Sequence, residues 1–467
     1  MQGSGQSTLA SERFSPWSAL AALLVGTFLG TITNSASNVA LAYIAAEWHY
    51  SLDRAVWVVS LYPLTFAVLL PLGGYLVDRW GVRRVYLMGV RLLALGALGC
   101  TFAPSLPWLL AFRVLQGVGA APLVPVVMAV TGHRIPYDQR GRATGYWALA
   151  NSVGHAAGPP LSGLLIHYLN WRAVFFFGLP LGIVALVLAR RLLPPDSPGE
   201  TRPFDAAGAV ALLALGLSTI LAVQTGARAG GMSSATTVFL TVALASAVTL
   251  AIVERRATSP ILQRHLLSNR ALVASVAVLS AQFFCLFGLQ LALPIYLIQG
   301  RGWTASTAGA LVLALPLATA LISPLAGRLA DRWGIRPVCA AGMLLAAASV
   351  GASFLWKPSS PWWAIGLVLG ALGASTGLAQ SPAASSVALL VSPEELGVAT
   401  GIFHMARFLS GSAGSTLFGV WMARAPTPAA GLRQNALIAL CVFACAATAA
   451  LGTPHRKSPR SRNSTTL

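Results

Sequence analysis

The chain has 467 residues, of which 56% are hydrophobic and only 9% are charged, and its formal net charge is +19. Soluble domains carry roughly a quarter charged residues because their surface faces water, so this composition excludes an ordinary soluble protein. The positive charge could suggest nucleic acid, but the arginines lie in short segments between apolar runs and no aromatic-basic stripe is present. Nucleic acid is therefore not an expected partner.

Apolar runs long enough to cross about 30 Å of hydrocarbon recur along the whole chain. Barrel strands alternate apolar and polar residues, whereas runs such as 209–223 are continuously apolar, so we expect helices. The first run is too long for a signal peptide and is read as a retained span. The predicted fold is all-α and integral to the membrane, with fourteen spans at 17–44, 55–77, 85–103, 107–131, 141–168, 172–193, 205–224, 235–253, 271–299, 304–330, 336–356, 361–391, 396–423 and 434–452.

The basic residues are unevenly divided between the two sides of these spans. The side of the N-terminus holds 21 of the 31 Lys and Arg residues, the other side holds 7, and 3 lie within spans. Cytoplasmic loops carry the excess of positive charge, so we expect both termini in the cytoplasm. The predicted location is the plasma membrane (the cell inner membrane), which the chain crosses many times.

The chain contains an internal repeat. Residues 71–85 match residues 324–338 at 10 of 15 positions, and residues 141–145 resemble residues 397–401 at nearly the same offset. The offset covers eight spans, whereas two six-helix halves need six, so spans seven and eight are an inserted pair. The predicted organisation is a cytoplasmic tail at 1–16, a six-helix bundle at 17–193, the inserted pair at 194–257, a second six-helix bundle at 258–452 and a basic cytoplasmic tail at 453–467.

Three motifs lie at the second, fourth and fifth spans, at Gly74–Arg84, Arg113–Gly117 and Gly154–Gly163. They resemble the G-x-L-x-D-R-x-G-R-[KR] loop, the R-x-x-Q-G motif and the exporter motif G-x-x-x-G-P-x-x-G-G of the major facilitator superfamily. The resemblance covers essentially the whole chain and is closest to the fourteen-spanner drug:proton antiporters. It implies the major facilitator fold, with a binding site between the two bundles.

The loop after span two and its repeat after span ten place a carboxylate among arginines. Such a carboxylate can accept charge-assisted hydrogen bonds or cap a neighbouring helix, and a glycine permits the tight turn. We expect a two-fold latch at the inner gate rather than a simple positive anchor. The predicted gating residues are Asp78, Arg79, Gly81, Arg83, Arg84, Asp331, Arg332, Gly334 and Arg336.

Small residues and prolines mark spans four and five. Glycines let neighbouring helices pack closely, and proline opens a backbone hydrogen bond of the helix. We expect helix packing at Gly117, Gly154, Gly158, Pro159 and Gly163.

Span one departs from the family pattern. The family usually has a membrane-embedded Asp in the motif L-D-x-T-I-V-N-V-A-L-P, and aligning on Asn38–Leu41 places Thr33 at that position. No acidic residue lies in the middle of any predicted span. His155 and His404, on the equivalent spans five and thirteen, could carry the proton instead, the alternative being two hydrogen-bonded core histidines.

The polar residues left in the middle of the spans include two arginines, Arg113 and Arg407. A buried arginine is costly unless it faces a cavity or a partner, and Arg113 could instead hydrogen-bond to backbone carbonyls. A cavity with these arginines and no acid should repel cations and favour neutral or anionic amphiphiles. The predicted coupling or substrate-cavity residues are Asn34, Asn38, Arg113, Gln116, Asn151, His155, Gln290, Gln380, His404 and Arg407.

We expect a secondary active transporter that exports hydrophobic small molecules, drugs or a biosynthetic product, by alternating access coupled to protons. The alternatives are an organic-anion importer or facilitator and a non-transporting receptor or scaffold. The sequence lacks G-x-S-x-G, H-E-x-x-H and phosphate-loop motifs, so an enzyme is not expected. The five cysteines lie in apolar segments without C-x-x-C spacing and are read as core fillers, with no metal or other cofactor. The expected partners are the substrate, the proton and the lipid bilayer, and the chain is expected to act as a monomer.

Overall fold

The computed structural model describes residues 15–136, 139–196, 206–256, 268–356, 359–391 and 396–454, and all regular elements among them are helices. Residues 1–14 and 455–467 of the predicted tails lie outside the described residues. The first part of the chain forms α2 (Pro16–Glu47), α3 (Leu52–Ala55), α4 (Trp57–Trp80), α5 (Val82–Thr101), α6 (Leu106–Ala120), α7 (Leu123–Arg134), α8 (Arg140–Tyr168), α9 (Arg172–Phe176) and α10 (Gly178–Leu192). The middle forms α11 (Ala206–Ala229) and α12 (Ser234–Arg256). The last part forms α14 (Arg270–Ile295), the π-helix η2 (Tyr296–Gly300), α15 (Ala305–Val312), α16 (Ala314–Trp333), α17 (Ile335–Ala352), the 3-10 helix η3 (Ser353–Leu355), α18 (Trp362–Leu390), α19 (Leu396–Arg424) and α20 (Pro428–Ala450).

The predicted all-α fold with fourteen spans is confirmed, although several spans consist of two helices joined at a break. Span four breaks at Ala121 and Pro122, because a proline lacks the amide hydrogen that continues a helix. Span two breaks at Val56, and its repeat, span ten, breaks at Leu313. Both copies therefore contain a break, although the offset of 253 pairs Val56 with Gly309 and not with Leu313.

The two helices α8 and α19 differ from most of the others in composition. Ten described segments are long and apolar enough to cross a membrane by hydropathy, and α8 and α19 are not among them despite their 29 residues each. They carry glycines and polar side chains, including His155 on α8 and His404 on α19. A helix that packs against other helices instead of lipid can carry such residues.

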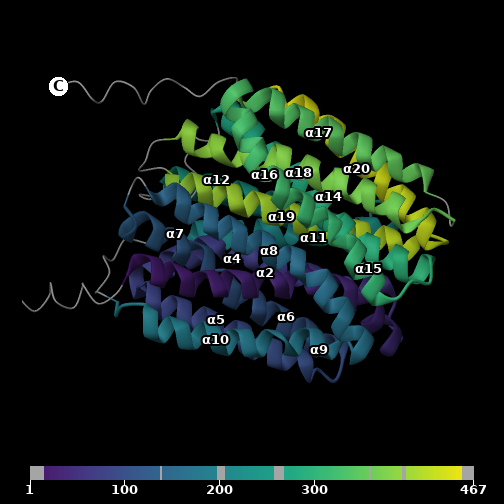
Figure 1. Ribbon diagram of the computed structural model, residues 1–467, viewed down its shortest axis with the longest axis horizontal. Coiled ribbons are helices and arrows are strands. Elements are labelled where there is room, and N and C mark those ends of the chain that lie inside the picture. Colours follow the sequence, from purple (N-terminus) through teal and green to yellow (C-terminus); the bar gives the residue numbers. More distant parts are fainter. Residues whose placement is uncertain are drawn as a thin grey trace, which may run out of the picture.

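The two groups of six spans, α2–α10 and α14–α20, share one packing pattern. α2 packs along α8 as α14 packs along α19, and α5 packs on α6 as α17 packs on α18. In Figure 1 the first group, purple to blue, lies below the second group, green to yellow. We call the contact between the groups the seam; it consists mainly of α4 against α19 and of α8 against α15 and α16.

The additional helices α11 and α12 pack on each other and touch the two groups on one side of the seam. α11 lies against α4 and α19, and a small cluster of Ala211, Leu212, Leu250 and Met405 fills the contact. On α12, Val238 is 58% exposed and Leu244 is 67% exposed, as expected for side chains that face lipid. The pair therefore covers one side of the seam.

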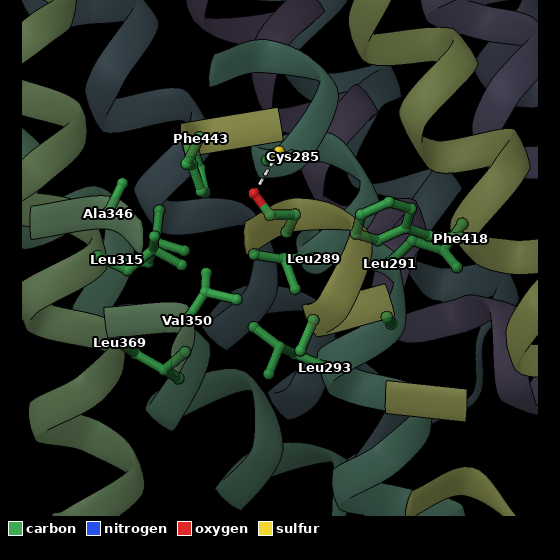
Figure 2. Close-up of a cluster of buried hydrophobic side chains, with 14 of the residues drawn as sticks. Cys285, Leu289, Leu291, Leu293, Leu315, Ala346, Val350, Leu369, Phe418 and Phe443 are labelled. Atoms are coloured by element: carbon green, nitrogen blue, oxygen red, sulfur yellow. Dashed lines mark hydrogen bonds between the residues drawn. The ribbon is translucent and has the colours of Figure 1, made fainter. Parts of the chain in front are cut away.

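α14 is the central helix of the second group. Leu289 and Leu293 lie on one face of this helix and Leu291 lies on another, yet all three are buried, together with Phe418 and Phe443 of the neighbouring helices (Figure 2). A helix that is apolar all round is buried on all sides. This helix also reaches across the seam, since it contacts α2.

The cysteines fall into two classes. Cys100, Cys285 and Cys339 are buried, as expected for core residues, and the Cys285 thiol lies 4.0 Å from the carbonyl oxygen of Ala439. The prediction is wrong for Cys441 and Cys445, which are exposed. They lie about one turn apart on the same side of α20.

Candidate transport site

A cavity lies between α2, α4, α7, α8 and α19, beside the seam. Its volume is about 40 Å³, whereas pockets for drug-sized ligands hold about 300–1,000 Å³. A substrate of that size therefore requires the two groups to move relative to each other. Its polar and aromatic walls include Asn34, Tyr62, Phe66, Asn151, His155 and Phe408.

The structure distributes the predicted cavity residues over several environments. Asn34, Asn151 and His155 line the cavity. Asn38, Arg113 and Gln116 are buried within the first group. Gln290, His404 and Arg407 are buried on α14 and α19, and Gln380 is half-buried on α18. Most of the cavity wall therefore comes from the first group, and the aromatic ring of Phe408 closes it from the second.

Arg113 is fully buried and all its contacts hold helices of the first group together. Its Nε donates a hydrogen bond to the Val58 carbonyl at 2.6 Å, and its Nη1 donates to Gln116 Oε1 at 2.9 Å. Its Nη2 donates to Ser37 Oγ at 3.2 Å, and the guanidinium lies 4.8 Å from the Tyr62 ring. These bonds join α6 to α2 and α4. They agree with the alternative considered for Arg113, in which it hydrogen-bonds to backbone carbonyls.

Arg407 is also buried, but among the described residues it contacts aromatic rings instead of hydrogen-bond acceptors. Its side chain is 5% exposed and lies over the rings of Phe283 and Phe408, at 4.2 and 4.8 Å from their centroids. Its Nε has no hydrogen-bond partner, and among the described residues the side chain makes no ion pair. A buried guanidinium is thus held by aromatic faces alone.

The two histidines lie on opposite sides of the seam. His155 Nδ1 lies 3.0 Å from the Asn151 carbonyl oxygen, which can only accept, so Nδ1 carries the hydrogen and Nε2 keeps its lone pair. The His404 ring packs edge-on against Trp147, with centroids 5.4 Å apart, and its Nδ1 has no partner. Each imidazole therefore has one buried nitrogen without a hydrogen-bond partner among the described residues.

The two ends of the bundle carry different charged groups. The arginine-rich face is the end with the turns at Gly81 and Gly334, and the opposite face is the end with Glu47 and Arg172. At the opposite face Arg172 forms an ion pair with Glu47 at 2.7 Å. Partial burial acts to raise the pKa of Glu47, but the hydrogen bonds from Arg172 and Trp171 lower it overall.

Near the opposite face, glycines bring the backbones of the two groups together across the seam. A Cβ at Gly163 of α8 would lie 2.5 Å from the carbonyl oxygen of Ala305 at the start of α15. A Cβ at Gly309 of α15 would likewise be too close to the carbonyl oxygen of Pro159 in α8. Any side chain at either position would separate the two helices.

Three serines join α4 and α19 in the same region. The hydroxyl oxygens of Ser60 and Ser415 lie 3.2 Å apart, and Ser412 donates a hydrogen bond to the Ser60 carbonyl at 3.1 Å. All three residues are buried. Near the opposite face the seam is therefore closed at two contacts, between α4 and α19 and between α8 and α15.

The other predicted packing glycines lie inside the first group. Gly154 and Gly158 of α8 face Thr31 and Ser35 of α2, with too little room for a Cβ. A Cβ at Gly117 of α6 would lie 2.9 Å from the carbonyl oxygen of Tyr62.

At the arginine-rich face the turns at Gly81 and Gly334 have positive φ angles of 85° and 93°, which glycine adopts easily. The side chains of Asp78 and Asp331 lie outside the described part of the structure, so their latch stays a prediction. Arg332 is exposed, and Arg79 donates a hydrogen bond to the Tyr75 hydroxyl on its own helix at 2.7 Å.

Asp196, which the sequence reasoning did not select, caps the N-terminus of α5. Its two carboxylate oxygens each accept a hydrogen bond at 2.8 Å, from the backbone amides of Arg83 and Arg84. In the second group the chain after α20 takes the same place, where the backbone amide of Arg336 donates to the Pro454 carbonyl at 3.2 Å. No motif signals Asp196, whose only mark is its position just after span six.

Replacing Asp196 with Ala is expected to destabilise the protein by about 1 kcal/mol, because two amides and the positive end of α5 lose their carboxylate. Asp196→Asn should fall between wild type and Asp196→Ala, since the amide oxygen keeps part of the cap. Thermal unfolding of the purified protein measures this order. An unchanged melting temperature in Asp196→Ala would contradict the capping role.

Two six-span groups with a small cavity beside their seam define a secondary transporter. The family model of the Major Facilitator Superfamily matches residues 23–415, and the chain belongs to this superfamily. It is a multi-pass membrane transporter, not an enzyme.

Known proteins similar to the chain fit this assignment. The chain is 31% identical over 384 residues to the Multidrug resistance protein Stp of Mycobacterium tuberculosis (strain CDC 1551 / Oshkosh), covering 82% of this chain and 71% of that protein. It is 28% identical over 405 residues to the Methylenomycin A resistance protein of Streptomyces coelicolor, covering 86% and 84%. Its fold is similar to the crystal structure of a D-xylose-proton symporter, with a TM-score of 0.67, 16% identity and coverage of 94% and 97%.

Proposed function

We propose that the protein exports hydrophobic small molecules from the cytoplasm, either drugs or a biosynthetic product, by alternating access. The observation that carries the proposal is the small cavity beside a seam that is closed near the opposite face. The positive-inside rule places the arginine-rich face in the cytoplasm, with both termini there. The closed side then faces outward, as expected before an exporter releases its substrate. The names of the two relatives, which refer to drug and antibiotic resistance, support the same direction.

Proton coupling is part of the proposal and rests on the histidines. The sequence has no carboxylate in the middle of a span, so the free nitrogens of His155 and His404 are the available titrating groups. His155 is surrounded by the Asn151 carbonyl and the Phe287 ring, and His404 by Trp147, Phe403 and Phe408. Among the described residues, Arg407 is a charged group that interacts with both imidazoles, and it lies one turn after His404 on α19. A proton on either imidazole therefore interacts directly with a fixed charge on the seam.

The His155→Gln, His404→Gln double variant is expected to lose about 90% of the transport driven by a pH gradient, because both proton acceptors are gone. Inverted membrane vesicles with an acidic interior report this as substrate accumulation. His167→Gln is the matched control, because His167 lies on the same helix as His155 but is exposed near the C-terminal end of α8. A double variant that responds to the gradient like wild type would contradict histidine coupling.

The direction and substrate range can be tested in cells. Cells with and without the gene are compared for susceptibility to cationic, neutral and anionic toxic compounds. Export predicts a lower internal concentration and higher tolerance for at least one compound when the gene is present. No difference across the panel, together with no flux in vesicles, would favour a receptor or scaffold.

A further inference from the structure

Arg407 is a buried cation that has no counter-ion in the part of the chain that the structure describes. Removing a guanidinium from water is costly unless hydrogen bonds and an opposite charge compensate it. Arg113 receives that compensation from two carbonyl groups and two side chains, whereas Arg407 rests only on Phe283 and Phe408. A guanidinium stacked on rings keeps its N–H groups directed outward in its own plane, where they can bind another group.

Two further buried nitrogens, on His404 and on Trp147 beside it, have no hydrogen-bond partner among the described residues. The Trp147 indole nitrogen is buried, can only donate, and has no acceptor. Its ring contacts His404, which lies one turn before Arg407 on α19, is 4% exposed and has an unpaired Nδ1. Trp147 belongs to α8 and the other two residues to α19, so these groups come from both sides of the seam. Of these three groups, the Arg407 guanidinium and the Trp147 indole can act only as donors, so the missing partner is an acceptor.

The apolar surroundings indicate the rest of the ligand. Phe408, on whose ring Arg407 lies, forms a wall of the cavity together with Phe66, and the two rings are in edge contact at 4.6 Å. An apolar body in the widened cavity could thus reach the guanidinium with a polar end. The cavity wall contains amides, hydroxyls and an imidazole but no carboxylate that would attract a cation.

We propose that Arg407, assisted by Trp147 and His404, binds the carboxylate of an amphiphilic organic acid, which is the substrate class of this transporter. The proposal rests on the proposed export function and narrows it. A carboxylate accepts two parallel hydrogen bonds from a guanidinium, so it supplies both the charge and the acceptors that the site lacks. The membrane potential, which is negative inside the cell, also drives an anion outward. Export of an organic acid therefore does not require a carboxylate within the membrane to bind a cation.

Binding of matched acid–amide pairs to the purified full-length protein tests the proposal. The probes are naphthaleneacetic, biphenylacetic and decanoic acids with their primary amides, and equilibrium dialysis at neutral pH gives the dissociation constants. At least one acid is expected to bind about tenfold more tightly than its amide, because only the acid forms the charged pair. Equal binding of every acid and its amide, or tighter binding of the amides, would overturn the proposal.

Variants assign the preference to the site. Arg407→Gln should remove the preference for the acid, and Arg407→Lys should keep part of it, since the ammonium retains the charge without the planar fork. Arg433→Gln, which removes an exposed charge on α20, is the control and should bind like wild type. An acid preference that survives in Arg407→Gln would refute the assignment.

If Arg407→Gln does not fold, Trp147→Phe replaces it, because this change removes the indole N–H and keeps an aromatic ring. It is expected to weaken binding of the acid several-fold and leave the amide unchanged, and equal effects on both would count against the site. The susceptibility panel in cells tests the export function independently of these binding experiments. A protein that binds acids through Arg407 and exports nothing would contradict the export function and leave the binding site standing.

Discussion

Replacement of Arg113 with Leu is expected to destabilise the protein by about 3 kcal/mol and to abolish transport. The change removes the hydrogen bonds from the guanidinium to the carbonyls of Thr33 on α2 and Val58 on α4, and it leaves the side chains of Gln116 and Ser37 buried without that donor. Hydrogen bonds from a charged group contribute about 1.5–3 kcal/mol each, and a broken buried network costs more than a surface one. Thermal unfolding and the yield of monodisperse protein measure the loss.

Arg113→Lys should recover only a small part of the stability, because one ammonium cannot reach the Val58 carbonyl, Gln116 and Ser37 together. Both variants should affect acids and amides equally, in contrast to the variants of Arg407. A stable Arg113→Leu protein with altered substrate preference would instead place Arg113 in the binding site.

Replacement of Gly309 with Val is expected to lower transport by about tenfold or more while the protein remains folded. A side chain here would press on the backbone carbonyl of Pro159, which cannot move aside as a flexible side chain would. The contact joins two groups that must separate and rejoin in each cycle, so the substitution opposes closing of the seam rather than folding of either group.

Gly370→Val on α18 is the matched control, because no atom lies within 4 Å of a Cβ built at that position. Transport in vesicles and thermal unfolding are measured for both variants. Normal transport by Gly309→Val would contradict the role of this contact, and an equal loss in Gly370→Val would show that valine in a helix is harmful by itself.

Hydropathy and the repeat predicted much of the fold, because both are visible in short continuous segments of the sequence. Fourteen apolar runs and a duplicated motif were sufficient to predict two six-helix bundles and an additional pair. The boundaries given for these units, and the latch at Asp78 and Asp331, stay predictions. The exposed Cys441 and Cys445 were misassigned because an apolar run does not show which side of its helix faces lipid.

The candidate site was harder to predict because its contacts connect distant residues. Arg113 and Arg407 look alike in sequence, each an arginine within a span. They differ because Arg113 finds acceptors on α2 and α4, whereas Arg407 finds only aromatic rings. Asp196 was missed for the same reason, since its partners on α5 lie 113 and 112 residues earlier in the chain.

The central claim is that the protein transports by opening and closing the seam, and a cross-link between Ser60 and Ser415 tests it most directly. Their hydroxyl oxygens lie 3.2 Å apart on opposite sides of the seam, so cysteines at both positions should form a disulfide in this closed arrangement. The double variant is made with the exposed Cys441 and Cys445 replaced by Ser, and transport in vesicles is measured after oxidation and again after reduction. Alternating access predicts that oxidation stops transport and reduction restores it, whereas undiminished transport by the cross-linked protein would contradict the account.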